Sequence, residues 1–182
     1  RFTSITGGQT LTLAAGVTTV ESVVIGTAAG LATGTTALNV DASAVVTALS
    51  ITGNAGANVL TGTTANDTLN GGAGDDTLDG GAGTNQLLGG LGNDTYTVDS
   101  AGDVVTEALT AGSDKVLSAI NYTLTANVEN LELTGSANLT GTGNTLANVL
   151  TGNSGSNVLA GLAGNDTLIG GAGNDTLDGG AG

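Results

Sequence analysis

The sequence predicts an all-β fold, a right-handed parallel β-solenoid, and three observations support it. A nine-residue pattern recurs in phase over two stretches of the chain. The last residues of a unit, such as Thr77-Leu78-Asp79, alternate polar, apolar and polar, as in a short strand with one inward side chain. With 33 glycines and 2% aromatic residues, the chain has too little apolar volume for a thick globular core, whereas a thin coil needs little filling.

The first array spans residues 53–97 and divides into five units of nine residues with no remainder. In order, the units are GNAGANVLT, GTTANDTLN, GGAGDDTLD, GGAGTNQLL and GGLGNDTYT. Glycine opens every unit. The sixth position holds Asn58, Asp67, Asp76, Asn85 and Asp94, and the eighth holds Leu60, Leu69, Leu78, Leu87 and Tyr96. Such regularity predicts that every unit adopts the same turn and strand.

The second array spans residues 143–182. Its units are GNTLANVLT, GNSGSNVLA, GLAGNDTLI and GGAGNDTLD, followed by four residues of a further unit. The sixth positions hold Asn148, Asn157, Asp166 and Asp175. Because the chain starts at Arg1 and breaks off inside a repeat, we expect it to be a fragment of a longer protein.

Units 71–79 and 170–178 match the pattern G-G-x-G-x-D-x-U-x at every fixed position, where U is apolar, and unit 89–97 matches with Tyr96 as the large residue. These residues resemble the RTX family of hemolysin-type calcium-binding repeats. The resemblance covers about half of the chain. It implies a calcium-binding β-roll in which two nonapeptides close one coil of eighteen residues, and turns two units apart lie side by side.

The chemistry of the turns agrees with a calcium role. Gly-Gly-x-Gly permits tight turns that direct carbonyl oxygens inward, and calcium takes six to eight oxygen ligands. The turn glycines whose carbonyls are candidate ligands are Gly71, Gly72, Gly74, Gly89, Gly90, Gly92, Gly161, Gly164, Gly170, Gly171 and Gly173. The aspartates at position six add negative charge.

In the family, calcium bridges the turns of units n and n+2. Carried onto this sequence, the pairs are Asn58 with Asp76, Asp67 with Asn85, Asp76 with Asp94, Asn148 with Asp166, and Asn157 with Asp175. Only Asp76 with Asp94 keeps both carboxylates, so we expect this site to be the tightest. In the mixed pairs, asparagine either offers its carbonyl oxygen to calcium or forms a hydrogen-bonded ladder with its neighbours. Asp166 also faces a unit that is only partly present, which predicts a half-built site.

Outside the arrays, residues 1–52 and 98–142 lack the nine-residue phase and are predicted to form irregular, wider coils. Short apolar alternations predict strands at residues 11–13, 23–25, 38–40, 49–51, 104–106, 115–117, 122–124 and 131–133. For residues 41–49 a helix competes, but β-branched residues and nearby turn signals favour strand. Asp41 is predicted to be a turn or capping residue.

Several function classes are excluded. The sequence has no His or Cys and no nucleophile elbow, so catalysis within it is not expected. A net charge of −14, with two basic residues, opposes nucleic-acid binding. No apolar run is long enough for a membrane span.

The predicted function is a non-enzymatic, calcium-dependent structural module of a large secreted or cell-surface bacterial protein. A surface layer, an extracellular filament or a matrix adhesin would each suit it, with several calcium ions and self-association. The resemblance adds type I secretion, in which the unfolded chain is exported and folds on extracellular calcium. The alternative is the secretion or folding tail of a toxin or exoenzyme whose active domain lies outside this segment.

Overall fold

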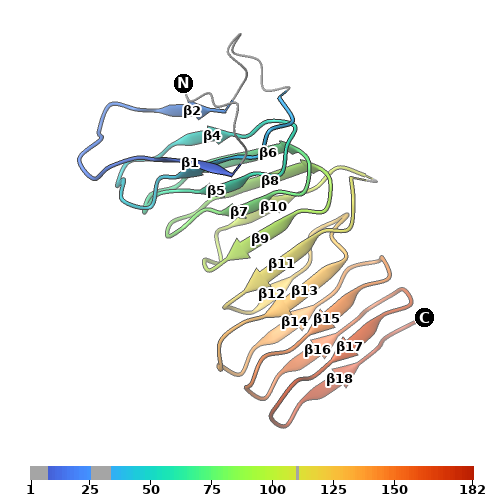
Figure 1. Cartoon of the computed structure of the whole chain (residues 1–182). Coiled ribbons are helices and arrows are strands. Elements are labelled where there is room, and N and C mark those ends of the chain that lie inside the picture. The colour runs from blue at the N-terminus through green and yellow to red at the C-terminus, as the bar shows by residue number, and fades with distance from the viewer. Residues whose placement is uncertain (1–7, 26–33, 110) are drawn as a thin grey trace.

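A computed structural model describes residues 8–25, 34–109 and 111–182, and their strands stack into a parallel solenoid (Figure 1). The predicted all-β solenoid is confirmed, and no helix occurs in these ranges. Within them, accordingly, no helix has the length and apolar character needed to cross a membrane. Parts of the predicted N-terminal coils, residues 1–7 and 26–33, lie outside the described residues.

One side of the stack is a nine-stranded sheet. Its strands, in spatial order, are β1 (Gln9–Thr12), β3 (Leu38–Asp41), β5 (Val59–Thr61), β7 (Thr77–Asp79), β9 (Thr95–Val98), β11 (Lys115–Ser118), β13 (Asn130–Leu133), β15 (Val149–Thr151) and β17 (Thr167–Ile169). Every pairing in this sheet is parallel. The chain therefore returns to this side once per coil.

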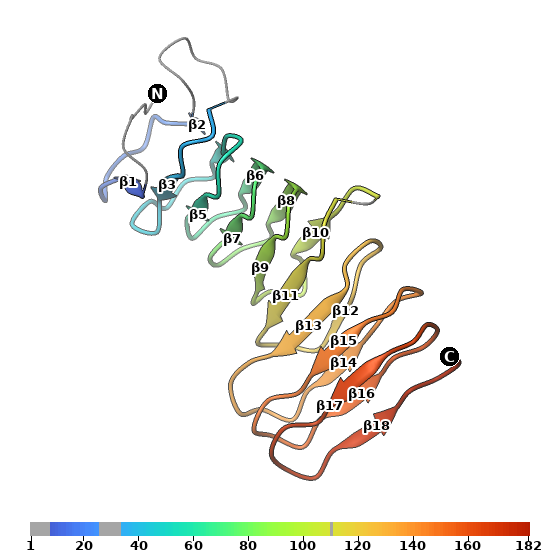
Figure 2. The same ribbon diagram turned by 45° about the vertical axis from the view of Figure 1, so that its right-hand side comes forward.

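The other side carries two shorter parallel sheets, and Figure 2 shows both columns of strands running along the stack. The five-stranded sheet contains β2 (Ser22–Val24), β4 (Ser50–Thr52), β6 (Thr68–Ala73), β8 (Gln86–Leu91) and β10 (Val104–Thr106). The four-stranded sheet contains β12 (Tyr122–Thr123), β14 (Thr140–Thr142), β16 (Val158–Ala160) and β18 (Thr176–Asp178). One coil thus consists of a strand on each side and two turns.

The strand register confirms the predicted coil of two nonapeptides. Leu60 pairs with Leu78, and Leu78 pairs with Tyr96, so equivalent residues lie eighteen positions apart. These eighth-position side chains point inward and are fully buried, while the flanking residues of each strand are more exposed. The core is a single narrow cluster of mainly leucine, valine and isoleucine side chains from both sides of the coil, which explains how so few aromatic residues suffice.

The coils outside the arrays have uneven lengths, as predicted. Gln9 pairs with Leu38, twenty-nine positions away, whereas Lys115 pairs with Asn130, only fifteen away. The predicted short strands are present to within one or two residues. Between β3 and β4, residues 42–49 form neither a helix nor a strand, so strand was the wrong expectation for most of that stretch. Asp41 caps the turn there, since its Oδ1 accepts hydrogen bonds from the Ser43 N–H and hydroxyl.

The eighteen-residue register continues past Thr97, where the sequence reading ended the first array. Val105 in β10 pairs with Leu87 in β8, eighteen residues earlier. The stretch VDSAGDVVT lacks an opening glycine but keeps an aspartate, Asp103, nine residues after Asp94. The nine-residue phase therefore extends to Thr106.

In several units, the second residue has a left-handed backbone conformation with positive φ. Gly90, at the second position of its unit, has φ = 109°, a region open mainly to glycine. In unit 161–169 the same position is Leu162, which adopts φ = 77° despite its side chain. Because a leucine there accepts the strain of a left-handed backbone, the turn geometry is imposed by the stack.

Replacing Gly90 with alanine should therefore destabilise the fold. A Cβ at this residue would collide with the carbonyl oxygen of Gly72 in the neighbouring coil, in addition to the cost of positive φ. We expect a loss of at least about 2 kcal/mol in the free energy of unfolding, measured by urea denaturation in calcium. Gly179→Ala is the control, because nothing lies near its Cβ position. Equal losses in the two variants would contradict this account.

Candidate metal centre

The position-six residues lie in the turns along two edges of the solenoid. On the first edge, the turns lead into the nine-stranded sheet and contain Asn58, Asp76, Asp94, Asn148 and Asp166. On the second edge, the turns lead into the two shorter sheets and contain Asp67, Asn85, Asn157 and Asp175. These side chains are almost fully buried, except those of Asp166 and Asp175 near the C-terminal end, which are half-buried. Each edge therefore carries a line of carboxylate and amide groups.

A hydrogen bond links each of these aspartates to the preceding coil. Asp76 Oδ1 accepts the backbone N–H of Asn58 at 2.7 Å, and Asp94 Oδ1 accepts that of Asp76 at 2.7 Å. In the second array, Asp166 Oδ1 accepts the N–H of Asn148 at 2.8 Å. One carboxylate oxygen of each aspartate is thus used to join neighbouring turns, and the other oxygen decides what else the turn can bind.

In one class of turn, the second carboxylate oxygen of an aspartate, or the single amide oxygen of an asparagine, accepts a hydrogen bond from within the same unit. The N–H of Thr63, at position two, donates to Asp67 Oδ2 at 2.6 Å. The N–H of Asn54 likewise donates to Asn58 Oδ1 at 2.8 Å. The same bond, from position two to position six, closes the turns that contain Asn148, Asn157 and Asp103. We call these closed turns.

In the other class, position two has positive φ and its N–H makes no bond to position six. The residues concerned are Gly72, Gly81, Gly90, Leu162 and Gly171. As a result, the Oδ2 atoms of Asp76, Asp94 and Asp166 are buried and accept no hydrogen bond from any described residue. We call these open turns. Asn85 also lies in such a turn, but its Nδ2 donates to Gly81 O at 3.0 Å and to Asp103 Oδ1 at 3.1 Å, so it is satisfied as an amide.

Further oxygens converge on the open turns. A Cβ built on Gly71 would collide with Asp76 Oδ2 and would lie 2.7 Å from the carbonyl oxygen of Gly89, one coil further on. At Gly161 the equivalent atoms are Asp166 Oδ2 and the carbonyl oxygen of Gly179. A carboxylate and a carbonyl from successive turns therefore face the same space beside a glycine. Two acceptors without a donor are suited to a cation.

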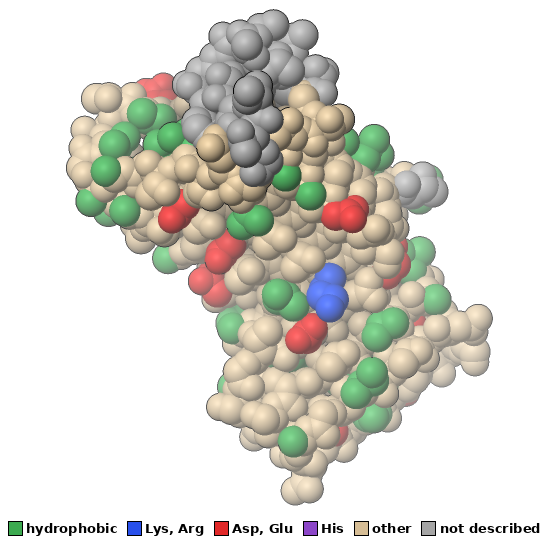
Figure 3. Space-filling view, viewed as in Figure 1, with side chains coloured by type: hydrophobic (Ala, Val, Ile, Leu, Met, Phe, Trp, Pro, Cys, Tyr) green, Lys and Arg blue, Asp and Glu red, His purple; other side chains and the backbone are tan. Residues whose placement is uncertain are grey.

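The electrostatics of the first edge agree with this requirement. The pKa of Asp76 is raised to about 7, chiefly by burial and also by the neighbouring charges of Asp94 and Asp75, against the opposing effect of its backbone hydrogen bond to Asn58. Burial likewise raises the pKa of Asp94 to about 6. The described residues contain one ion pair, Lys115 with Glu132 at 3.3 Å, and both side chains are partly exposed. On the face shown in Figure 3, acidic groups are scattered, and the basic surface lies beside one of them.

These contacts fit calcium at some of the predicted residues better than at others. Asp76 and Asp94 occupy open turns that are neighbours along the first edge. Their free oxygens and the Gly89 carbonyl oxygen are hard ligands of the kind that calcium prefers. The closed turns contain Asp67, Asn58, Asn148 and Asn157. Their oxygens accept hydrogen bonds, as in the hydrogen-bonded alternative for the mixed pairs. Calcium ligation by each of these residues, and by the turn glycines, stays a prediction.

Sequence reasoning missed three acidic residues that the fold buries beside these lines. Asp103 continues the second edge, and its Oδ1 accepts the Asn85 N–H at 2.9 Å. Its nine-residue distance from Asp94 was a usable signal. Asp114 continues the first edge, and its Oδ1 accepts the Asp94 N–H at 2.8 Å. Neither Asp114 nor the nearby Glu107 keeps the spacing of the Gly-Gly-x-Gly-x-Asp turn, so only the stacked structure brings them together.

The comparison with known families agrees with the turn geometry. The model of the RTX calcium-binding nonapeptide repeat matches in four copies, over residues 52–87, 61–96 and 151–182. Comparison with curated proteins and with solved structures gave no match. The matched residues contain both classes of turn described above. The chain therefore carries RTX calcium-binding nonapeptide repeats, and its two arrays belong to the family of those repeats.

Proposed function

We propose that this chain is a calcium-binding structural module of a large secreted or cell-surface bacterial protein. The observation that carries the proposal is the pair of buried, unpartnered carboxylate oxygens of Asp76 and Asp94, in open turns that are neighbours along the first edge. RTX repeats form non-catalytic calcium-binding rolls, and the parallel solenoid built from them here supports the same role for this chain. Its proposed task is to provide a rigid extended element outside the cell.

Calcium would be held by residues of the turns. Asp76 and Asp94 supply carboxylates, and the glycines of the same turns, such as Gly71 and Gly89, supply carbonyl oxygens. Bound calcium supplies the positive charge that these groups lack. Further proposed ligands are Asp166 and Asp175, in the open turns of the second array. Each of these aspartates is paired with an asparagine in the preceding coil, Asn148 or Asn157, so each pair has one carboxylate fewer than Asp76 with Asp94.

Binding and folding are proposed to be coupled. The chain has a net charge of −14, and folding brings Asp76, Asp94 and Asp114 into one line of hydrogen-bonded turns. Without a cation, burial and mutual repulsion oppose the ionised form of each carboxylate. The module would thus stay unfolded where calcium is scarce and fold where it is plentiful, which suits export of an unfolded chain by type I secretion.

Self-association into a surface layer or filament is the assembly part of the proposal. In the last coil, Leu177 lies at the inward eighth position but is 47% exposed, because no further coil covers it here. Equivalent leucines such as Leu159 are fully buried. A surface of this kind can be covered by further coils of the same protein or by another copy, because an uncapped solenoid end invites pairing with another chain.

Calcium should drive the chain from coil to β structure. Far-ultraviolet circular dichroism across a calcium titration should show this transition, and magnesium at the same concentrations should not replace it, because magnesium demands shorter and more regular coordination. Light scattering that rises after folding would support a self-assembling scaffold. Folding without a rise would favour the monomeric tail of a toxin or exoenzyme. A chain already folded in chelator would overturn the coupling.

Asp76→Asn should weaken the response to calcium. The substitution keeps an oxygen for the Asn58 N–H but replaces the free Oδ2 with an amide that cannot bind a cation. We expect the calcium concentration at the folding midpoint to rise about ten-fold, equivalent to about 1.4 kcal/mol. The matched control is Asp75→Asn, which removes the same charge at an exposed neighbour whose Oδ1 accepts the Asn93 N–H. Equal midpoints for the two variants would count against a site at Asp76.

Acid should partly replace calcium. The folded pKa values of Asp76 (about 7) and Asp94 (about 6) exceed their ordinary value of 3.8, so the folded chain binds more protons than the unfolded chain between these values. Stability contributed by these groups is therefore full at low pH and lost as the pH rises through the folded pKa values. In chelator, circular dichroism should show more β structure as the pH falls from about 7 towards about 4.

The double variant Asp76→Asn/Asp94→Asn is the control for this pH dependence. Both side chains are then neutral at every pH, so the β signal should depend less on acidity than in the original chain. Loss of β structure on acidification over the same range would contradict the assignment of these two groups.

A further inference from the structure

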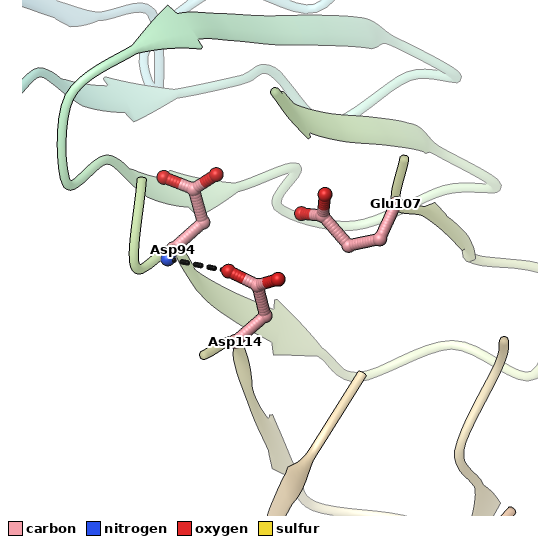
Figure 4. Close-up of side chains that lie close together, drawn as sticks. All are labelled: Asp94, Glu107 and Asp114. Carbon is pink, nitrogen blue, oxygen red and sulfur yellow. Dashed lines mark hydrogen bonds between the residues drawn. The ribbon is translucent and has the colours of Figure 1, made fainter. Parts of the chain in front are cut away.

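Three buried acidic side chains meet at the C-terminal end of the family-matched part of the first array, Asp94 inside the match and the other two beyond it. Asp94 precedes β9, Glu107 follows β10, and Asp114 precedes β11. Figure 4 shows their carboxylates turned toward a common space, and one oxygen from each lies within 4.8 Å of the others. The exposed fractions of the three residues are 1%, 7% and 0%. The fold therefore brings together three buried acidic residues, each of which lies next to the end of a different strand.

Two of these acids have an oxygen without a partner. Asp94 Oδ1 and Asp114 Oδ1 accept backbone hydrogen bonds, from Asp76 and Asp94 respectively, but the Oδ2 atoms accept none from any described residue. Glu107 is bonded at both oxygens, through the Tyr96 hydroxyl and, at 3.2 Å, through the N–H of Ala108. The hydroxyl oxygen of Tyr96 is thus a further oxygen beside the cluster.

No basic side chain offsets this charge in the described structure. Lys115 directly follows Asp114, but its amine reaches the surface and pairs with Glu132 at 3.3 Å. Another acid, Glu129, lies beside the cluster, and its Oε2 accepts the Asp114 N–H at 2.8 Å. The cluster therefore lacks a positive charge, which a bound cation would supply.

We propose that Asp94, Glu107 and Asp114 bind a calcium ion that ties the first array to the spacer. The site shares Asp94 with a repeat turn but differs from the repeat in its other ligands. Glu107 stands eighteen residues after Gly89, where the repeat has glycine, and supplies a side-chain carboxylate. Asp114 follows a turn two residues longer than Gly89–Asp94 and lies outside the matched residues. The ion would hold β9, β10 and β11 together.

The ligand type suits calcium, which takes six to eight oxygen ligands in flexible geometry. One oxygen from each of the three acids lies within 4.8 Å of the others, so a single ion can reach all three. Three carboxylates would also neutralise a divalent ion with one negative charge left over.

Glu107→Gln tests the site by ion counting on the whole chain. Equilibrium dialysis against calcium followed by elemental analysis should show one bound ion fewer per chain than in the original protein, with the other ions retained. Asp114→Asn should give the same loss, since asparagine can still accept the Asp94 N–H while the free oxygen is replaced. Glu21→Gln, the same substitution at an exposed residue, should leave the count unchanged.

Terbium luminescence provides a readout that depends on position. In a Tyr122→Phe background, Tyr96 is the remaining tyrosine and can sensitise terbium bound beside it. Glu107→Gln should remove much of this emission, while circular dichroism in calcium shows that the roll still folds. An unchanged ion count and unchanged emission in both Glu107→Gln and Asp114→Asn would overturn the site. Absence of calcium binding by the original chain would instead refute the proposed function.

Discussion

The solenoid depends on one repeated hydrogen bond, from a backbone N–H to a position-six aspartate, or to Asn85, one coil later. Asp94 Oδ1 accepts the Asp76 N–H in this way at 2.7 Å. Strands of about three residues pair over too short a length to hold the stack rigidly by themselves, so these bonds reinforce the register at the turns. They also carry a cost, because a carboxylate that reaches the next coil is removed from water together with its second oxygen.

Position two of the repeat decides how that cost is met. A residue with ordinary backbone angles, such as Thr63, donates its N–H to the second oxygen and completes the turn within the protein. A residue with positive φ, such as Gly72 or Gly90, leaves that oxygen free and creates a demand for a cation. Closed turns therefore serve as hydrogen-bonded spacers, and open turns are candidate calcium ligands. One repeat pattern thus provides structural and metal-binding turns in a single stack.

Much of the fold could be predicted because the repeat is local and regular. The inward positions of Leu60, Leu78 and Tyr96 follow directly from the nine-residue period. Prediction was poorer where the period is broken. Asp103 kept the spacing without the glycines, and Glu107 and Asp114 kept neither. Their proximity to Asp94 arises from the stacking of coils of unequal length, which no local pattern encodes.

The sequence by itself determined the length of the coil, the inward side chains and the family of the repeats. These properties follow from the match between a nine-residue period and the two-residue alternation of a strand. The tertiary structure decided which position-six oxygens are free, as at Asp76, and which are bonded, as at Asp67. The reason is directional, since a hydrogen bond requires an N–H that points at the oxygen, and that direction is set only when one coil lies on the next.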